Sequence, residues 1–156
     1  MIRIWIASLL FLPCVVLAEE KTADGGFVVS ADEKAALDET NAQRRAAGLP
    51  PLVPNERLFQ AARAHSANMA RQGRLDHMLD GTDVSTRVRW AGYRLASAAE
   101  NIAWNSPDAA AALRLWMSSG GHRANILSRE FTEIGVAVAV NARGERYWTQ
   151  VFARSH

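Results

Sequence analysis

Residues 134–140 are apolar on both of the faces that a β-strand would have. Isoleucine and valine stand at the even positions of this segment, and glycine and alanine stand at the odd positions. Because successive side chains of a strand point to opposite faces of a sheet, this pattern predicts a strand that is covered on both sides. The side with only glycine and alanine suggests a helix that packs close against the sheet. The segment therefore favours a sheet enclosed between two helical layers.

The residues that follow predict a hairpin. Residues 141–145 contain Gly144 and are typical of a hairpin loop longer than two residues, and residues 147–152 form the return strand. Upstream, helical periodicity and cap residues predict four helices. These are bounded by Ser30 and Gly48, by Asn55 and Gly73, by Val84 and Gly92, and by Ser106 and the Gly120–Gly121 pair. The predicted fold is of the α+β class, a three-layer α-β-α sandwich with a small antiparallel sheet.

The N-terminus has the pattern of a signal peptide. Arg3 precedes an apolar run, residues 4–12, that is too short to span a membrane, and Ala18 is a suitable cleavage residue. We therefore predict a signal peptide over residues 1–18, a flexible lead-in over residues 19–30 and one domain over residues 31–154. The alternative is a retained N-terminal anchor. Cleavage would remove Cys14, the only cysteine, and leave an exported, cysteine-free chain with no stable membrane span.

The charge distribution excludes one class of partner. The formal net charge is only +2 at pH 7, and the arginines are scattered along the chain without a dense basic block. No nucleic-acid-binding surface is indicated, because such surfaces concentrate lysine and arginine on one face. A surface of mixed, solvated charges is the expectation.

Two of the four histidines are set aside as candidates for chemistry. His65 lies in the apolar stripe of the second predicted helix, with Leu58, Ala62 and Met69, and is predicted to be a core residue. His156 ends the chain.

The other two histidines, His77 and His122, fall near predicted helix ends, and Glu100 is the carboxylate closest to an apolar run. Folding could bring them together as ligands of a divalent ion such as Zn²⁺, with open positions for water or ligand. The same groups could act as an acid–base cluster, or they could simply hydrogen-bond two loops to a helix. A serine nucleophile at Ser118 or Ser119 is disfavoured, because serines at a helix end usually serve as caps.

Taken in order, the segments of this chain resemble the CAP superfamily, which includes cysteine-rich secretory proteins, antigen 5 and plant pathogenesis-related proteins. The similarity extends from about residue 35 to residue 152 and is strongest to the bacterial, cysteine-free, single-domain branch. The segments that carry it are residues 41–49, 58–69, 73–77, 87–93, 100–103, 116–127, 134–136 and 147–152.

The resemblance implies a sandwich with a central cleft and a His-Glu-Glu-His cluster within it. His77 and Glu100 occupy the first histidine and first glutamate positions of that cluster. Ser119 stands at the second glutamate position and Tyr147 at the second histidine position, so two of the four groups are replaced. His122, typical of the bacterial branch, is expected to supply the missing imidazole.

Three functions are compatible with this resemblance. The first is a secreted or periplasmic, monomeric CAP-domain protein that binds a lipid-like or sterol-like molecule or a divalent cation. Its cleft would contain His77, Glu100 and His122, with Ser119, Tyr147 and Gln150 in secondary positions. The second is a hydrolase of peptides or envelope components that uses the same histidines and glutamate. The third is a non-catalytic module that binds an envelope protein through the loops around Trp90 and Trp104.

Overall fold

In the computed structural model, which describes residues 27–156, the segment with two apolar faces forms strand β3 (Glu133–Val140). It pairs antiparallel with β4 (Arg146–Ser155), which pairs antiparallel with β2 (Leu95–Trp104). A two-residue strand, β1 (Val53–Pro54), pairs parallel with β3, so the sheet order is β1-β3-β4-β2. The predicted hairpin is confirmed, and the sheet gains two strands that were not predicted, the ten-residue β2 and the short parallel β1.

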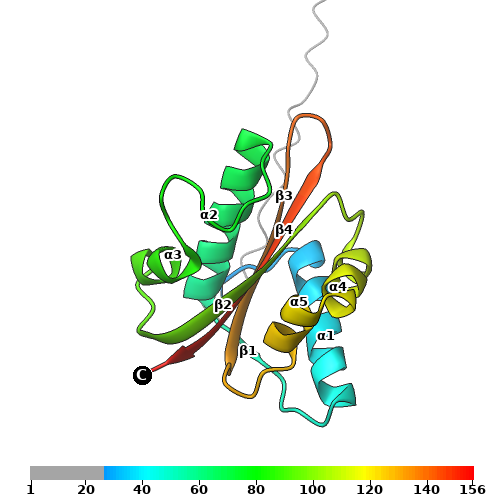
Figure 1. Cartoon of the computed structure of the whole chain (residues 1–156), viewed down its shortest axis with the longest axis vertical. Helices are drawn as coiled ribbons and strands as arrows, with labels where there is room; N and C mark the ends of the chain where they lie inside the picture. Colours follow the sequence, from blue (N-terminus) through cyan, green and yellow to red (C-terminus); the bar gives the residue numbers. More distant parts are fainter. Residues whose placement is uncertain (1–26) are drawn as a thin grey trace, which may run out of the picture.

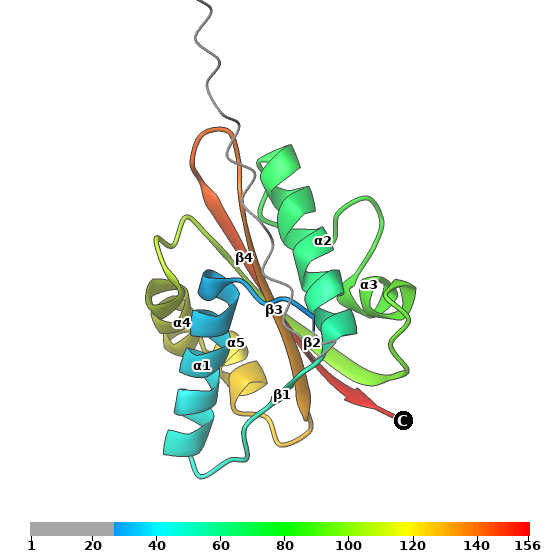
Figure 2. The same cartoon turned by 180° about the vertical axis from the view of Figure 1, so that it is seen from behind.

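Helices cover both faces of this sheet (Figures 1 and 2). One layer contains α1 (Ala31–Ala46), α4 (Ala109–Ser118) and α5 (Gly120–Ile126). The other contains α2 (Glu56–Gln72), which packs on β3 and β4, and α3 (Val84–Trp90), which packs on β2. The three-layer α-β-α sandwich is therefore confirmed.

Local cap interactions explain where the first two helices begin and end. The Ser30 hydroxyl accepts a hydrogen bond from the Glu33 backbone N–H (3.3 Å), and the Glu33 carboxylate accepts one from the Ser30 N–H (2.9 Å). Asn55 caps α2 by accepting from the N–H of Arg57 at 3.0 Å. Gly73 ends α2 in the left-handed conformation, with φ of 62°. These bounds agree with those predicted from the sequence.

The predicted start of α4 was wrong by two residues. Asp108, rather than Ser106, caps the helix by accepting from the N–H of Ala111 at 2.7 Å. The Ser106 carbonyl instead accepts a hydrogen bond from the indole N–H of Trp148 at 2.9 Å, which fixes that residue to the sheet.

The Gly120–Gly121 pair was predicted to end a helix, and this was also wrong. The chain breaks one residue earlier, at Ser119 (φ −98°, ψ 127°), and Gly120 opens the additional helix α5. A buried arginine stabilises the far end of this short helix. The Arg44 guanidinium, 1% exposed, donates to the carbonyls of Ile126 (2.8 Å) and Ser128 (2.7 Å). These carbonyls would otherwise have no partner at the helix end.

The close approach of α2 to the sheet, suggested by the small residues of β3, occurs at Gly135. A Cβ atom added to this glycine would lie 2.1 Å from the Leu58 carbonyl carbon and 2.3 Å from the Phe59 nitrogen. The backbone of α2 therefore rests directly on the backbone of β3. The hydrophobic core lies on both sides of the sheet, and α2 contributes to each side, with Phe59 in one cluster and Leu58 in another.

The predicted signal peptide, residues 1–18, lies outside the described residues, as do residues 19–26 of the predicted lead-in. Residues 27–30 are described and contact α2. The ring centroids of Phe27 and Phe59 are 5.0 Å apart, and the Val28 carbonyl accepts a hydrogen bond from Arg63 at 2.6 Å. Within residues 27–156, no helix combines the length and the apolar character needed to cross a membrane.

Candidate functional site

A buried carboxylate lies at the centre of the candidate site. Glu100 is in the edge strand β2, on the face covered by α2 and α3, and its side chain is 2% exposed. One carboxylate oxygen, Oε1, is 2.9 Å from Nδ1 of His77, and the other, Oε2, accepts from Arg87 at 2.6 Å. Burying an ionised carboxylate is costly unless it is paired and hydrogen-bonded, and these two contacts meet that requirement.

Arg87 also holds the loop that carries His77. From its position in α3, its guanidinium donates to the backbone carbonyls of His77 (3.1 Å) and Thr82 (2.6 Å). The loop that connects α2 with α3 is therefore fixed to the same cation that neutralises Glu100. Sequence reasoning did not select Arg87. The sequence indicated such a residue only indirectly, because a carboxylate that is buried beside an apolar run requires a cation nearby in the fold.

His65 is a second member of this cluster that sequence reasoning did not assign to the site. The prediction that it is a core residue is confirmed, because it is 1% exposed. Its Nε2 lies 3.6 Å from Oε1 of Glu100, which is close but too long for a hydrogen bond. Burial lowers the pKa of His65, and this effect outweighs the opposing effect of the Glu100 carboxylate. His65 is therefore neutral at pH 7.

The depressed pKa of His65 predicts a loss of stability in mild acid. As the pH falls through 6.5, the ordinary pKa of histidine, the unfolded chain takes up a proton on His65 that the folded chain refuses. Each such proton lowers the free energy of unfolding by at most about 1.4 kcal/mol per pH unit. Urea unfolding between about pH 7 and about pH 5 should show this slope, and a His65→Gln variant should show a smaller one.

An equal slope in the variant would contradict this account of His65. Two other histidines set the background. His122 also has a lowered pKa and adds to the same acid sensitivity. His77 has a raised pKa, so its contribution to stability is present in acid and is lost as the pH rises through its folded-state pKa. His77 and His122 are present in both the parent and the His65→Gln variant, so their contributions to the slope cancel when the two proteins are compared.

The two candidate imidazoles differ in environment. The His77 side chain is 56% exposed, and its hydrogen bond to Glu100 raises its pKa. His122, in the first turn of α5, is partly buried, which lowers its pKa, and the nearby charge of His77 lowers it further. Its Nδ1 is buried and has no hydrogen-bond partner among the described residues. The structure therefore pairs His77 with Glu100, whereas His122 lies on α5, in the helical layer on the other face of the sheet, where its carbonyl accepts a hydrogen bond from Asn101.

Gln150 was expected in the same cleft, but the structure places it on the opposite face of the sheet. It is fully buried, donates to the hydroxyl of Thr40 (2.6 Å) and accepts from Asn101 (3.1 Å). Asn101 also donates to the carbonyl of His122 (3.1 Å) and accepts from Asn125 (2.9 Å). The alternation of side chains along β2 explains the separation, because Glu100 and Asn101 must point to opposite faces.

The structure places Tyr147 and Ser119, the other two secondary candidates, in the core and directly before α5. Tyr147 is 1% exposed and packs in an apolar cluster with Met69, Leu79 and Ile102. It lies on the Glu100 face of the sheet but serves as a core residue there. Ser119 is the residue before α5, partly exposed, and its side chain makes no cap hydrogen bond.

The described residues do not fit a preformed metal centre. Within residues 27–156, no three histidine, cysteine, aspartate or glutamate side chains are arranged to hold a metal ion. The physical reason lies at Glu100, whose two oxygens already contact His77 and Arg87. A cation at Glu100 would have to compete with the Arg87 guanidinium for the same carboxylate.

Comparison with known proteins agrees with this architecture. Residues 37–152 match the family model described as CAP, the cysteine-rich secretory protein family. The uncharacterized protein YkwD of Bacillus subtilis (strain 168) is 37% identical over 126 residues, which cover 80% of this chain and 48% of YkwD. The chain thus spans about half the length of this curated relative.

Solved structures show the same fold. An extracellular protein containing an SCP domain from Bacillus anthracis str. Ames has a TM-score of 0.74 and 30% sequence identity, with 80% of this chain and 40% of that chain covered. An outer surface protein from Borrelia burgdorferi has a TM-score of 0.75 at 17% identity, covering 80% and 93% of the two chains. This second likeness shows the fold alone. From the family match and the YkwD alignment together, the chain belongs to the CAP family, the cysteine-rich secretory proteins.

Proposed function

We propose that this chain is an exported CAP-domain protein that binds a lipid-like or sterol-like ligand, with His77 contacting the polar group of that ligand. The observation that carries the proposal is the 2.9 Å contact between His77 Nδ1 and the buried carboxylate of Glu100. Export is supported by the signal-like pattern of residues 1–18 and by the similarity to the extracellular SCP-domain protein from Bacillus anthracis.

The contact with Glu100 leaves one nitrogen of His77 available. Because Nδ1 faces the carboxylate, Nε2 is the ring nitrogen that a ligand can approach, and a carboxylate partner fixes the orientation of the ring. A half-exposed imidazole anchored in this way is pre-organised, so binding costs little conformational entropy. Its raised pKa favours the protonated form, which donates to an acceptor group such as a hydroxyl, carbonyl or carboxylate.

The surroundings of His77 favour an amphipathic ligand. Leu75 and Met78 lie on either side of His77 in the chain and are 45% and 57% exposed. Two large exposed apolar side chains within two residues of one anchored polar group would complement a molecule that has an apolar body and a single polar group. A divalent ion is the less favoured ligand, because Glu100 is already engaged by Arg87.

Fluorescent ligands provide the test. The purified protein is titrated with cis-parinaric acid and with dehydroergosterol, and in a separate calorimetric series with Zn²⁺, Mn²⁺, Ca²⁺ and Mg²⁺. At least one lipid probe should bind, and His77→Ala should weaken that binding by about tenfold or more, since an ionic or charge-assisted hydrogen bond contributes about 1.5–3 kcal/mol. The matched control is His156→Ala, which removes an exposed imidazole at the end of the chain.

Other outcomes would overturn the proposal. Equal lipid binding by His77→Ala and His156→Ala would remove His77 from the site. Stoichiometric Zn²⁺ binding that is lost in His77→Ala, without lipid binding, would show that the ligand is a metal ion and not a lipid. Turnover of a peptide or peptidoglycan substrate that is lost in His122→Ala would replace binding by hydrolysis.

A further inference from the structure

Strand β3 has a stretch of edge that no strand within residues 27–156 covers. On the side away from β4, β1 pairs only with Glu133 and Ile134, through Val53 and Pro54. Beyond this point the sheet order places no further strand beside β3. The remainder of β3, residues 135–140, therefore pairs with β4 alone among the described strands.

The hairpin geometry identifies the backbone groups along this edge. Asn141 N–H donates to the Glu145 carbonyl at 3.0 Å, which closes the hairpin on the β4 side. Because hydrogen-bonding direction alternates along an antiparallel strand, the N–H and C=O groups of Val136, Val138 and Val140 point away from β4. Val136 is fully buried, so the edge is accessible only at Val138, which is partly exposed, and at Val140, which is 55% exposed. The Ile134 carbonyl, in the same alternation, accepts from Asn55 on the β1 side at 3.0 Å, which agrees with this assignment.

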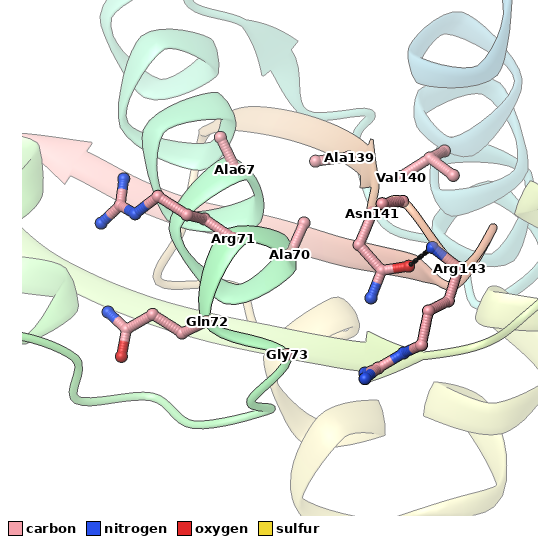
Figure 3. A pocket seen from close by; sticks show the side chains of 10 residues that line it. Ala67, Ala70, Arg71, Gln72, Gly73, Ala139, Val140, Asn141 and Arg143 are labelled. Carbon is pink, nitrogen blue, oxygen red and sulfur yellow. Dashed lines mark hydrogen bonds between the residues drawn. The ribbon is translucent and has the colours of Figure 1, made fainter.

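A groove runs beside the far half of this edge (Figure 3). It has a volume of about 580 Å³ and lies between the C-terminal part of α2 and the β3–β4 hairpin. Small side chains, Ala67 and Ala70 of α2 and Ala139 of β3, line the groove, so a peptide backbone can approach closely. The charged side chains that line it are Arg71 from α2 and Arg143 from the hairpin loop.

The usual protections of a sheet edge do not occur in this stretch. Exposed edges are commonly protected by a lysine, a proline or a β-bulge. β1 contributes Pro54 where it covers β3, but residues 136–140 contain no charged residue and no proline. Their register with β4 is continuous and contains no bulge. An edge with these properties is suited to accept another strand.

We propose that an extended, acidic peptide segment of a partner protein adds to β3 as a strand, with carboxylate side chains contacting Arg71 and Arg143. Both arginines are accessible, with side chains 70% and 68% exposed. Their present partners, Asp80 and Glu145, form surface ion pairs that contribute little stability and are easily exchanged. The C-terminal end of α2 carries partial negative charge and repels an anion. This repulsion is weaker than the attraction of the two arginine side chains.

A designed peptide tests the proposal directly. The probe is a fluorescent peptide of about ten residues that alternates glutamate with valine, long enough to form one strand. We expect its fluorescence anisotropy to rise on binding. Affinity should fall about tenfold or more when a central residue of the peptide is replaced by proline, or when its glutamates are replaced by lysines.

Protein variants separate the two contributions. Val138→Pro removes one edge N–H that points away from β4, and the double variant Arg71→Glu/Arg143→Glu reverses the charge of the groove. Each should weaken binding about tenfold or more, whereas the matched control Arg114→Glu, an exposed residue of α4, should not. Hydrogen exchange should slow at the amides of Val138 and Val140 when the peptide is added.

Several results would overturn the proposal. Binding that survives both the proline peptide and Val138→Pro would show a purely electrostatic contact. Slow exchange at these two amides in the protein alone, unchanged by peptide, would show that the edge is already paired. Concentration-dependent dimerisation that is lost in Val138→Pro, observed by sedimentation velocity, would make a second copy of the chain the partner.

Discussion

Replacing Gly135 by alanine is expected to destabilise the fold by about 3 kcal/mol, in the upper part of the range for overpacked cores. The new Cβ atom would lie 2.1 Å from the Leu58 carbonyl carbon and 2.3 Å from the Leu58 carbonyl oxygen. Both contacts are with backbone, so no side chain can rotate to relieve them. The helix α2 must instead move away from β3 and lose packing along its length. Urea unfolding followed by tryptophan fluorescence measures the change.

Gly120→Ala is the matched control for this prediction. Gly120 opens α5, and a Cβ atom added there would meet nothing within 4 Å. Alanine should therefore be neutral or stabilising by up to about 1 kcal/mol, because it reduces the entropy of the unfolded chain. If both variants unfold at the same urea concentration as the parent protein, α2 and β3 are not in backbone contact at Gly135.

Removal of the Glu100 carboxylate should have an effect of similar or greater size. In Glu100→Ala, the Arg87 guanidinium, 7% exposed, would stay buried without its 2.6 Å partner. Breaking a buried ion pair from one side typically costs about 3–5 kcal/mol. We therefore expect the free energy of unfolding to fall by this amount. The exposed control Asp38→Ala, which removes the partner of Lys34, should change it by less than about 0.5 kcal/mol.

A double variant distinguishes a lost ion pair from a general packing defect. If the cost of Glu100→Ala comes from the unpaired cation, then Glu100→Ala/Arg87→Met should be more stable than Glu100→Ala alone. A double variant that is less stable than the parent protein by the sum of the two single-variant effects would mean that the two side chains act independently. The comparison also matters for ligand experiments, since loss of binding in Glu100→Ala can follow from unfolding. His77→Ala avoids this difficulty because His77 is half exposed.

The parts of the fold that could be predicted from the sequence are those determined by residues that lie close together in the chain. Ser30, Asn55 and Gly73 act through neighbours within a few residues, and the apolar pattern of residues 134–140 depends only on the period of a strand. Strand β2 was not predicted because residues 95–104 are rich in alanine and include polar residues with low strand propensity. Its extended form depends on pairing with β4, a contact that is distant in sequence.

The candidate site was predictable to the same limited extent. His77 and Glu100 could be selected as chemically suitable groups, and the structure places them 2.9 Å apart. Arg87 and His65 could not be assigned to Glu100, because only the packing of α2 and α3 on one face of the sheet brings all three together. Gln150 was expected to lie in the same cleft as Glu100, but it lies on the opposite face of the sheet. Which face of β4 it occupies depends on the register with its neighbouring strands.

The consecutive residues Glu100 and Asn101 have a consequence for how the chain finds its correct strand pairing. A slip of one residue along β4 would turn Glu100 towards the amide network of Gln150 and leave Arg87 facing the Asn101 amide. Alanine-rich β2 has little else to distinguish one alignment from the next. This dipeptide thus helps to set the alignment, since any slip by an odd number of residues would bury the Glu100 carboxylate away from Arg87 and is therefore disfavoured.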